Sequence, residues 1–230
     1  MSQHIGIVAC SAEGAALCYR TICAEAPPEM GQHRHPEITM HTHPLADYMP
    51  GITSGNWKAV AELMLSSARI AAQAGADFAI CPDNTIHQAL PLVTPHSPIP
   101  WLHIAETMAE EARRHGYHRL AILGTKYLIT GPVYPEALKK SGLAWEIPND
   151  EQRERIDKLI FTELVNGIFQ EETRLYFNQV IGEMKKRGCD AAVLGCTEIP
   201  LIVDPQDCPL PALDSTRLLA RAALRRALEQ

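Results

Sequence analysis

With 230 residues, of which 46% are hydrophobic and 21% charged, the chain can bury the core of one large domain or two small ones. Its formal net charge of −6 provides no field that would attract a phosphate backbone, so we expect no nucleic-acid partner. The N-terminus lacks a basic region followed by an apolar run, and no later window reaches membrane-spanning length. We therefore expect a cytoplasmic protein that does not bind a membrane.

The cysteines are scattered, odd in number and without a CxxC pair, which is typical of a reducing compartment. They stand at Cys10, Cys18, Cys23, Cys81, Cys189, Cys196 and Cys208.

Short aliphatic runs alternate with longer segments of helical period along the whole chain. This alternation predicts an α/β fold with parallel sheets. The expected strands are 5–8, 38–41, 78–80, 120–123, 191–194 and a short one near Leu213, and the expected helices include 57–74, 104–115, 150–168 and 171–187.

The chain also repeats itself. Residues 75–86 resemble residues 188–199 at an offset of 113, so that Asp83 corresponds to Cys196. Two further blocks recur in the same order, 5–10 with 120–125 and 98–103 with 209–214. We therefore expect two similar Rossmann-like halves related by a pseudo-twofold axis, with the active site between them. The first half is 1–101, with the C-terminal helix 214–230 packed on it, and the second is 102–213.

The repeated block places a reactive side chain directly after a strand in each half. Ligands of open parallel sheets bind at the carboxyl ends of the strands, where helix N-termini offer N–H groups to anions. Asp83 and Cys196 would then approach one small cavity from opposite sides. Asn84, Thr85 and Thr197, with neighbouring backbone N–H groups, would hold a substrate carboxylate.

Several motifs resemble those of the aspartate/glutamate racemases over nearly the whole chain. They are Gly75-Ala-Asp77, Asn84-Thr85, Leu123-Gly-Thr125, Leu194-Gly-Cys196-Thr-Glu-Ile-Pro200 and Asp214-Ser-Thr216. The resemblance implies a homodimeric isomerase without pyridoxal phosphate or another cofactor. Such an enzyme exchanges the α-proton of a small carboxylate, an amino acid, between two bases.

The chain departs from the family pattern at Asp83, where the first catalytic cysteine usually stands. Cys81 lies two residues earlier, a displacement of about 6–7 Å along a strand, which is too far for it to substitute. With ordinary pKa values, Asp83 is an anion and Cys196 a thiol at neutral pH. Protonating Asp83 and deprotonating Cys196 instead would cost about 6 kcal/mol. Burial of Asp83 and helix N–H groups near Cys196 would reduce this cost.

Two alternatives to a racemase remain open. A lyase that decarboxylates substituted malonates needs only the Cys196 thiol as proton donor, and a non-catalytic binder of small acids would tolerate its loss. Substrate choice is open as well. Ile168 and Leu128 stand where a Lys and a Thr are usual in relatives specific for aspartate or glutamate, so a distal carboxylate would lack its partner.

The remaining candidate residues have less specific roles. Thr125, Cys10 and Ser11 are expected to line the substrate site, and Glu198 and His87 to orient neighbouring groups. Structural roles compete with each assignment, because a cysteine often packs in a core and an Asp, Asn or Thr often caps a helix.

Two pairs of histidines, His33 with His35 and His41 with His43, have the i, i+2 spacing of a strand face that could hold a metal. No carboxylate or cysteine partner follows them closely, and we expect no metal site. His43 ends its strand and could reach the rim of the pocket.

Overall fold

The computed structural model describes residues 2–229, which form two compact units. Unit 1 contains the residues up to Thr107 and those from Thr216 onward, and unit 2 contains Met108–Ser215. Within residues 2–229, no helix combines the length and apolarity that crossing a membrane requires.

Unit 1 is built on a parallel four-stranded sheet with the order β2-β1-β3-β4. Its strands are β1 (Ile5–Ala9), β2 (Ile38–Thr42), β3 (Phe78–Ile80) and β4 (Trp101–Leu102). Its α-helices are α1 (Ala12–Glu25), α2 (Pro27–Met30), α3 (Leu45–Ser54), α4 (Trp57–Gln73), α5 (Leu90–Val93), the start of α6 (Ile104–Arg114) and α12 (Ser215–Leu228), with 3-10 turns at Thr85–Ala89 and Thr94–His96.

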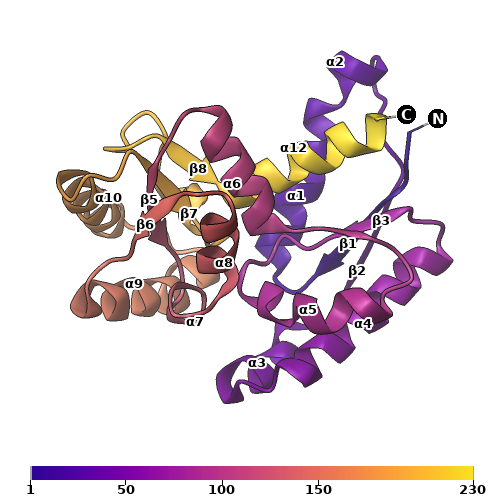
Figure 1. Cartoon of the computed structure of the whole chain (residues 1–230), viewed down its shortest axis with the longest axis horizontal. Helices are drawn as coiled ribbons and strands as arrows, with labels where there is room; N and C mark the ends of the chain where they lie inside the picture. Colours follow the sequence, from indigo (N-terminus) through magenta and orange to yellow (C-terminus); the bar gives the residue numbers. More distant parts are fainter. Residues whose placement is uncertain (1, 230) are drawn as a thin grey trace. The chain divides into compact units, whose positions relative to one another are not determined.

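Helices cover both faces of the unit 1 sheet. Alternate residues of β1, such as Ile5 and Ile7, pack in one core cluster with α1 and α12. Gly6 faces the other side, where an added Cβ would lie 3.0 Å from the Cβ of Ala71 in α4. Figure 1 shows α1 and α12 on one side of this sheet and α4 on the other. Strands covered on both faces must be apolar throughout, which explains the fully buried β1.

Unit 2 repeats this design with the sheet order β6-β5-β7-β8, again all parallel. Its strands are β5 (Arg119–Leu123), β6 (Ala144–Glu146), β7 (Ala191–Leu194) and β8 (Ala212–Asp214). Besides the rest of α6, its helices are α7 (Lys126–Ile129), α8 (Val133–Lys140), α9 (Asp150–Thr162), α10 (Glu171–Lys186) and α11 (Ile199–Ile202), with a 3-10 turn at Leu164–Asn166.

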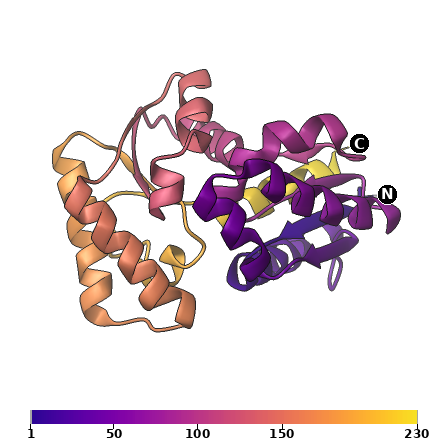
Figure 2. The ribbon, with the colours of Figure 1, turned by 90° about the horizontal axis from the view of Figure 1, so that it is seen from below.

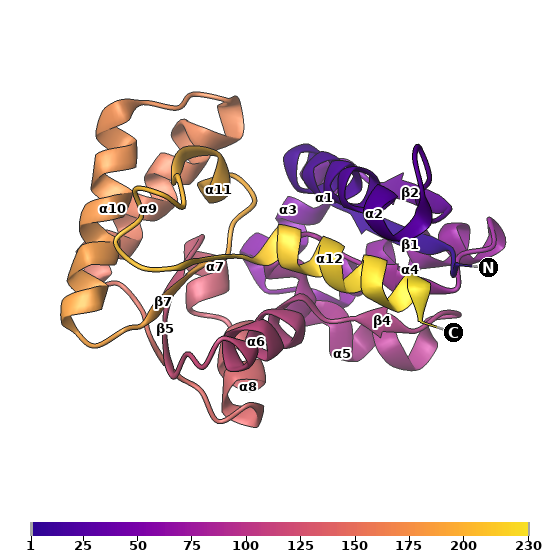
Figure 3. The same ribbon diagram turned by 90° about the horizontal axis from the view of Figure 1, so that it is seen from above.

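Two long helices, α9 and α10, pack against one face of the unit 2 sheet. Ile160 of α9 and Phe177 of α10 share a core cluster with Leu123 and Leu194 of the strands. Figures 2 and 3 show the two helices running alongside each other.

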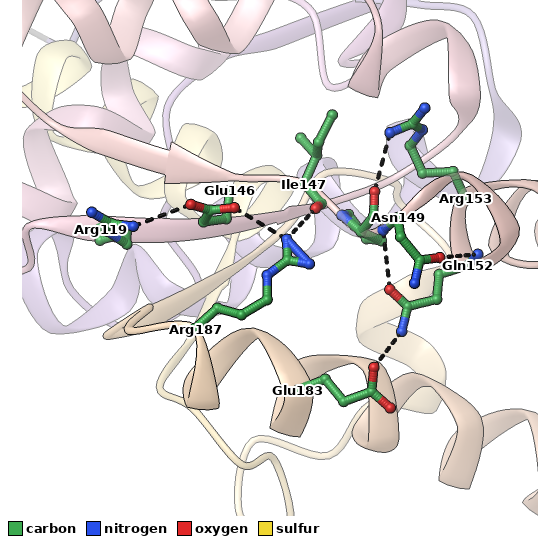
Figure 4. A network of polar contacts seen from close by, with 9 residues as sticks. Arg119, Glu146, Ile147, Asn149, Gln152, Arg153, Glu183 and Arg187 are labelled. Carbon is green, nitrogen blue, oxygen red and sulfur yellow. Dashed lines mark hydrogen bonds and ion pairs between the residues drawn. The ribbon is translucent and has the colours of Figure 1, made fainter.

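A polar network ties the edge of this sheet to the same helices (Figure 4). Arg119 and Arg187 each lie 3.1 Å from the carboxylate of Glu146, and Gln152 donates to Glu183 at 2.6 Å. Because these ion pairs are largely exposed, we expect each to stabilise the fold by less than about 1 kcal/mol.

The internal repeat is also visible in hydrogen bonds at the N-terminal ends of the strands in each sheet. The carboxylate of Asp77 accepts from the backbone N–H of His4 at 2.7 Å, and that of Asp190 accepts from the N–H groups of His118 at 2.6 Å and Arg119 at 3.0 Å. Each of these aspartates therefore joins the strand it precedes to the central strand of its unit. The predicted α/β fold with two similar parallel sheets is confirmed.

The expected helix 150–168 is too long. In the structure α9 ends at Thr162, and the 3-10 turn Leu164–Asn166 follows it. The side chain of Asn166 donates to the carbonyl groups of Phe161 and Thr162, and Gly167 has a φ of 71° that favours glycine. Strands β4 and β6 were not predicted, and both are short edge strands with exposed or half-buried residues, unlike the fully buried β3.

Candidate active site

In unit 1 the carboxylate of Asp83 lies at the N-terminus of α1. It accepts hydrogen bonds from the backbone N–H of Cys10 at 3.0 Å and from that of Ser11 at 3.1 and 3.2 Å. Ser11 is the N-cap of α1, and its hydroxyl oxygen accepts from the N–H of Gly14 at 3.4 Å. Backbone N–H groups at a helix N-terminus favour the ionised form of a carboxylate. The side chain of Asp83 thus caps the start of α1 and not the helical turn that follows it in the sequence.

Two buried thiols accompany this carboxylate. Burial, and then the nearby charge of Asp83, raise the pKa of Cys10 and of Cys81 far above the usual range of a thiol. The Sγ of Cys81 also lies 3.8 Å from the carbonyl oxygen of Asp83. Both thiols stay protonated at neutral pH, so neither provides a nucleophile or base in unit 1.

The ring of His87 forms hydrogen bonds with the backbone of Asp83 and of Ile104. Its Nε2 accepts from the N–H of Ile104 at 3.3 Å, so Nδ1 carries the proton and donates to the carbonyl of Asp83 at 3.0 Å. Burial, and then the neighbouring His103, lower the pKa of His87 to about 3. The ring is therefore neutral at physiological pH and orients the main chain at Asp83.

In unit 2 the thiol of Cys196 directly contacts a carboxylate. Its Sγ donates to Oε2 of Glu198 at 2.9 Å. Cys196 is half-buried and Glu198 is only 5% exposed. A nearby negative charge disfavours a thiolate, so this contact keeps Cys196 in the thiol form when Glu198 is ionised.

The backbone around Cys196 is so closely packed that neither Gly195 nor Gly124 could carry a side chain. A Cβ added to Gly195 would lie 2.6 Å from Cδ2 of Leu128 and 2.8 Å from the carbonyl oxygen of Leu123. A Cβ on Gly124 would meet the same Cδ2 at 2.7 Å. Leu128, which is 1% exposed, thus packs on both glycines and positions the ends of β5 and β7.

Further contacts hold the strand ends of unit 2. Thr125 is the N-cap of α7, and its hydroxyl accepts from the N–H of Leu128 at 3.4 Å. The N–H of Lys126 donates to Asp157 of α9 at 2.9 Å. The hydroxyl of Ser215 donates to the carbonyl of Leu194 at 3.0 Å. Asp157 and Ser215 were not among the predicted site residues, although the Asp214-Ser-Thr216 motif pointed to the latter.

The predicted site residues thus form two groups, each at the carboxyl ends of the strands of one unit. The group in unit 1 comprises Cys10, Ser11, Asp83, Asn84, Thr85 and His87, and the group in unit 2 comprises Thr125, Cys196, Thr197 and Glu198. Ile168 lies after the 3-10 turn of unit 2 and is 43% exposed.

Of the two spaced histidine pairs, His33 and His35 precede β2, whereas His41 lies within β2 and His43 directly follows it. His33 and His35 are exposed, and Nδ1 of His35 lies 2.7 Å from the carbonyl of Pro36. Nδ1 of His41 is hydrogen-bonded to Ser67 at 2.9 Å. Between residues 2 and 229, no three or more His, Cys, Asp or Glu side chains gather as metal ligands would.

Comparison with known proteins identifies the family of this chain. Residues 5–223 match the family described as Asp/Glu/hydantoin racemase. The broad specificity amino-acid racemase RacX of Bacillus subtilis is 26% identical over 150 residues, which make up 65% of this chain and 64% of that protein. The chain thus spans less than two thirds of the length of this curated relative.

Solved structures extend the similarity to the whole chain. A protein of Yersinia pestis described as an Asp/Glu racemase candidate has a TM-score of 0.91 and 28% identity, covering 99% of this chain and 100% of that one. An aspartate racemase homologue from Pyrococcus horikoshii OT3 has a TM-score of 0.87 and 25% identity, covering 100% of both chains. With its family match over nearly all residues, the chain belongs to the Asp/Glu/hydantoin racemase family.

Proposed function

We propose that this chain is a cofactor-independent amino-acid racemase or epimerase that exchanges the α-proton of a small carboxylate substrate between Asp83 and Cys196. Family membership and the named activity of the Bacillus subtilis relative support the reaction type. The equivalent places of Asp83 and Cys196 in the internal repeat support the pairing. From the family resemblance, we also propose that the chain acts as a homodimer.

The observation that supports the mechanism is the contrast between the hydrogen bonds of the two groups. Asp83 accepts from two backbone N–H groups, which favour its anion, and Cys196 donates to Glu198, which favours its thiol. In one direction Asp83 removes the α-proton and becomes a carboxylic acid. The Cys196 thiol then protonates the opposite face of the carbanion and becomes a thiolate, so one proton is taken up and one is released.

Glu198 raises the basicity of Cys196 in the reverse half of this cycle. A Cys196 thiolate beside an ionised Glu198 would place two negative charges about 2.9 Å apart in a buried position. The contact therefore makes the thiolate a stronger base, which takes up the α-proton of the opposite enantiomer in the reverse direction and becomes a thiol again.

For the substrate we propose an amino acid without a distal carboxylate. Leu128 fills the space over the two strand-end glycines of unit 2 with an apolar side chain, and Ile168 provides no cation. The carboxylate of an aspartate or glutamate side chain would meet no charge partner at either residue.

Incubation of the protein in heavy water with a panel of L- and D-amino acids tests this function. We expect deuterium at the α-carbon together with inversion of configuration, and we expect no inversion in Cys196→Ala. If Asp83→Ala racemised at the full rate, the two-base assignment would be wrong.

A lyase that needs only Cys196 is the second candidate, and one observation favours it. Asp83 already binds the N-terminus of α1, which is a sufficient structural role, whereas Cys196 and Glu198 alone form an acid pair. Arylmalonates distinguish the two candidates, because a lyase releases carbon dioxide from them and leaves amino acids unchanged. If neither reaction occurs and Cys196→Ala still binds small acids, the chain is a binding protein.

A further inference from the structure

The substrate carboxylate needs hydrogen-bond donors, and two backbone donors of unit 1 are already occupied. The backbone N–H groups of Cys10 and Ser11, at the start of α1, both donate to Asp83. A substrate that enters while Asp83 is in place cannot use these two N–H groups, so a side-chain donor beside them at this edge of the sheet could take their place. The next strand of the sheet is β2, which pairs with β1 in parallel.

His43 directly follows β2 and lies beside this position. Ala9 pairs with Thr42 at the last step of the register between β1 and β2. Cys10 and His43 directly follow these two residues. Neighbouring strands lie about 4.8 Å apart, so His43 leaves the sheet beside the residue whose N–H binds Asp83.

The ring of His43 is held in one orientation while its Nε2 lacks a partner. It makes edge-to-face contacts with His41, at 4.9 Å between centroids, and with Tyr48, at 6.5 Å. His41 in turn is fixed by its hydrogen bond to Ser67. Nε2 of His43 is buried and has no hydrogen-bond partner among the described residues. Buried polar atoms are nearly always paired, so this exception needs an explanation, and a ligand that accepts a hydrogen bond provides one.

We propose that Nε2 of His43 donates a hydrogen bond to the carboxylate of the substrate and so binds it beside Asp83. This inference rests on the proposed racemase function and adds a substrate-binding residue to it. A metal at this place is disfavoured, because residues 2–229 supply no third ligand and Nδ1 of His41 is already bonded.

Substitutions that remove or keep the nitrogen test the proposal. His43→Phe keeps an aromatic ring but no nitrogen, His43→Gln places an amide near the position of Nε2, and His43→Asn places one near Nδ1. A hydrogen bond to a charged group is at stake, so we expect KM to rise about ten- to hundredfold in His43→Phe and His43→Asn. In His43→Gln we expect a rise of less than about threefold, with kcat of all three variants changed less than about threefold.

The matched control is His35→Phe, which changes an exposed histidine of the other spaced pair and should leave KM unchanged. A KM in His43→Phe equal to that of the wild type would overturn the proposal, as would equal KM values for the Gln and Asn variants. Should His43→Phe not fold, the comparison of Gln with Asn decides. If the wild-type protein exchanges no α-proton, the proposed function fails, and not this inference alone.

Binding without turnover provides a second measurement. The probe is 2-aminoisobutyrate, an amino acid that has no α-proton to lose. We expect the Nε2 signal of His43 to shift in nitrogen NMR spectra as the probe is added, and the probe to inhibit the wild type more strongly than His43→Phe. Inhibition with an unchanged His43 signal, or the absence of any binding, would contradict the proposal.

Discussion

The two units have the same strand order but use the ends of their strands differently. In unit 1 the side chain at the repeated position, Asp83, binds back to the N-terminus of α1. In unit 2 the equivalent Cys196 contacts Glu198, and the N–H of Lys126, which corresponds to that of Ser11, donates instead to Asp157 of another helix.

This difference shows how a duplicated fold can acquire unequal halves. The neutral His87 that fixes the backbone in unit 1 is replaced by Pro200 in unit 2 at the same offset of 113 residues. Unit 1 thus presents a carboxylate bound by backbone N–H groups, and unit 2 presents a thiol that donates to a carboxylate. In the proposed mechanism the first group is the base and the second is the acid.

The strongest test of the comparison removes the acid of unit 2. In Cys196→Ala we expect racemisation to fall about a thousandfold or more, because no group remains to protonate the second face. Polarimetry with both enantiomers of the best substrate measures this. Cys208→Ala is the matched control, since Cys208 lies in the same unit away from the strand ends, and it should keep its activity.

Substitutions at Asp83 test whether a thiol, as in unit 2, can replace the carboxylate of unit 1. We expect Asp83→Asn to lower kcat about a hundredfold or more, because the amide keeps the shape but cannot accept the α-proton. In Asp83→Cys, a titratable group returns and the N–H groups of Cys10 and Ser11 are released. We expect this variant to exceed Asp83→Asn in rate by at least about tenfold. Equal rates for the two variants would show that Asp83 acts only as a structural anion.

Glu198 should influence both the rate and the reactivity of the thiol. We expect Glu198→Gln to lower kcat about tenfold, because the thiolate loses the neighbouring charge that makes it a stronger base. In the resting enzyme the same change removes a negative charge, so iodoacetamide should alkylate Cys196 several times faster. Mass spectrometry of the labelled peptide follows this reaction. A slower alkylation would contradict the assigned contact.

The last prediction concerns the acid stability of unit 1. The pKa of His87 is about 3 in the folded chain, against an ordinary value of 6.5. As the pH falls below about 6.5, the unfolded chain binds the proton first, so the free energy of unfolding decreases until the pH reaches about 3. The slope from this one group is at most about 1.4 kcal/mol per pH unit.

We expect His87→Gln to lose this part of the acid sensitivity. At pH 7 we expect the variant to be less stable than the wild type, because the native histidine makes both hydrogen bonds there. Urea unfolding at several pH values measures the slope. An unchanged slope between pH 6.5 and 4 would show that His87 titrates normally.

The fold class and the internal repeat could be predicted from the sequence alone. The alternation of apolar runs and helical segments predicted the α/β class, and the offset of 113 residues predicted two similar sheets with Asp83 and Cys196 after equivalent strands. These features are local or periodic, because a buried parallel strand must be apolar throughout and the turn after it must carry the polar side chains.

Only the tertiary structure decided the partners of those side chains. Asp83 meets the N–H groups of Cys10 and Ser11 across more than 70 residues, and Leu128 packs on glycines of two different strands. The burial that makes His87 neutral likewise depends on the segments that surround it. Hydrogen bonds between distant segments and the loss of water around a charge arise only when those segments pack together, so no local pattern encodes them.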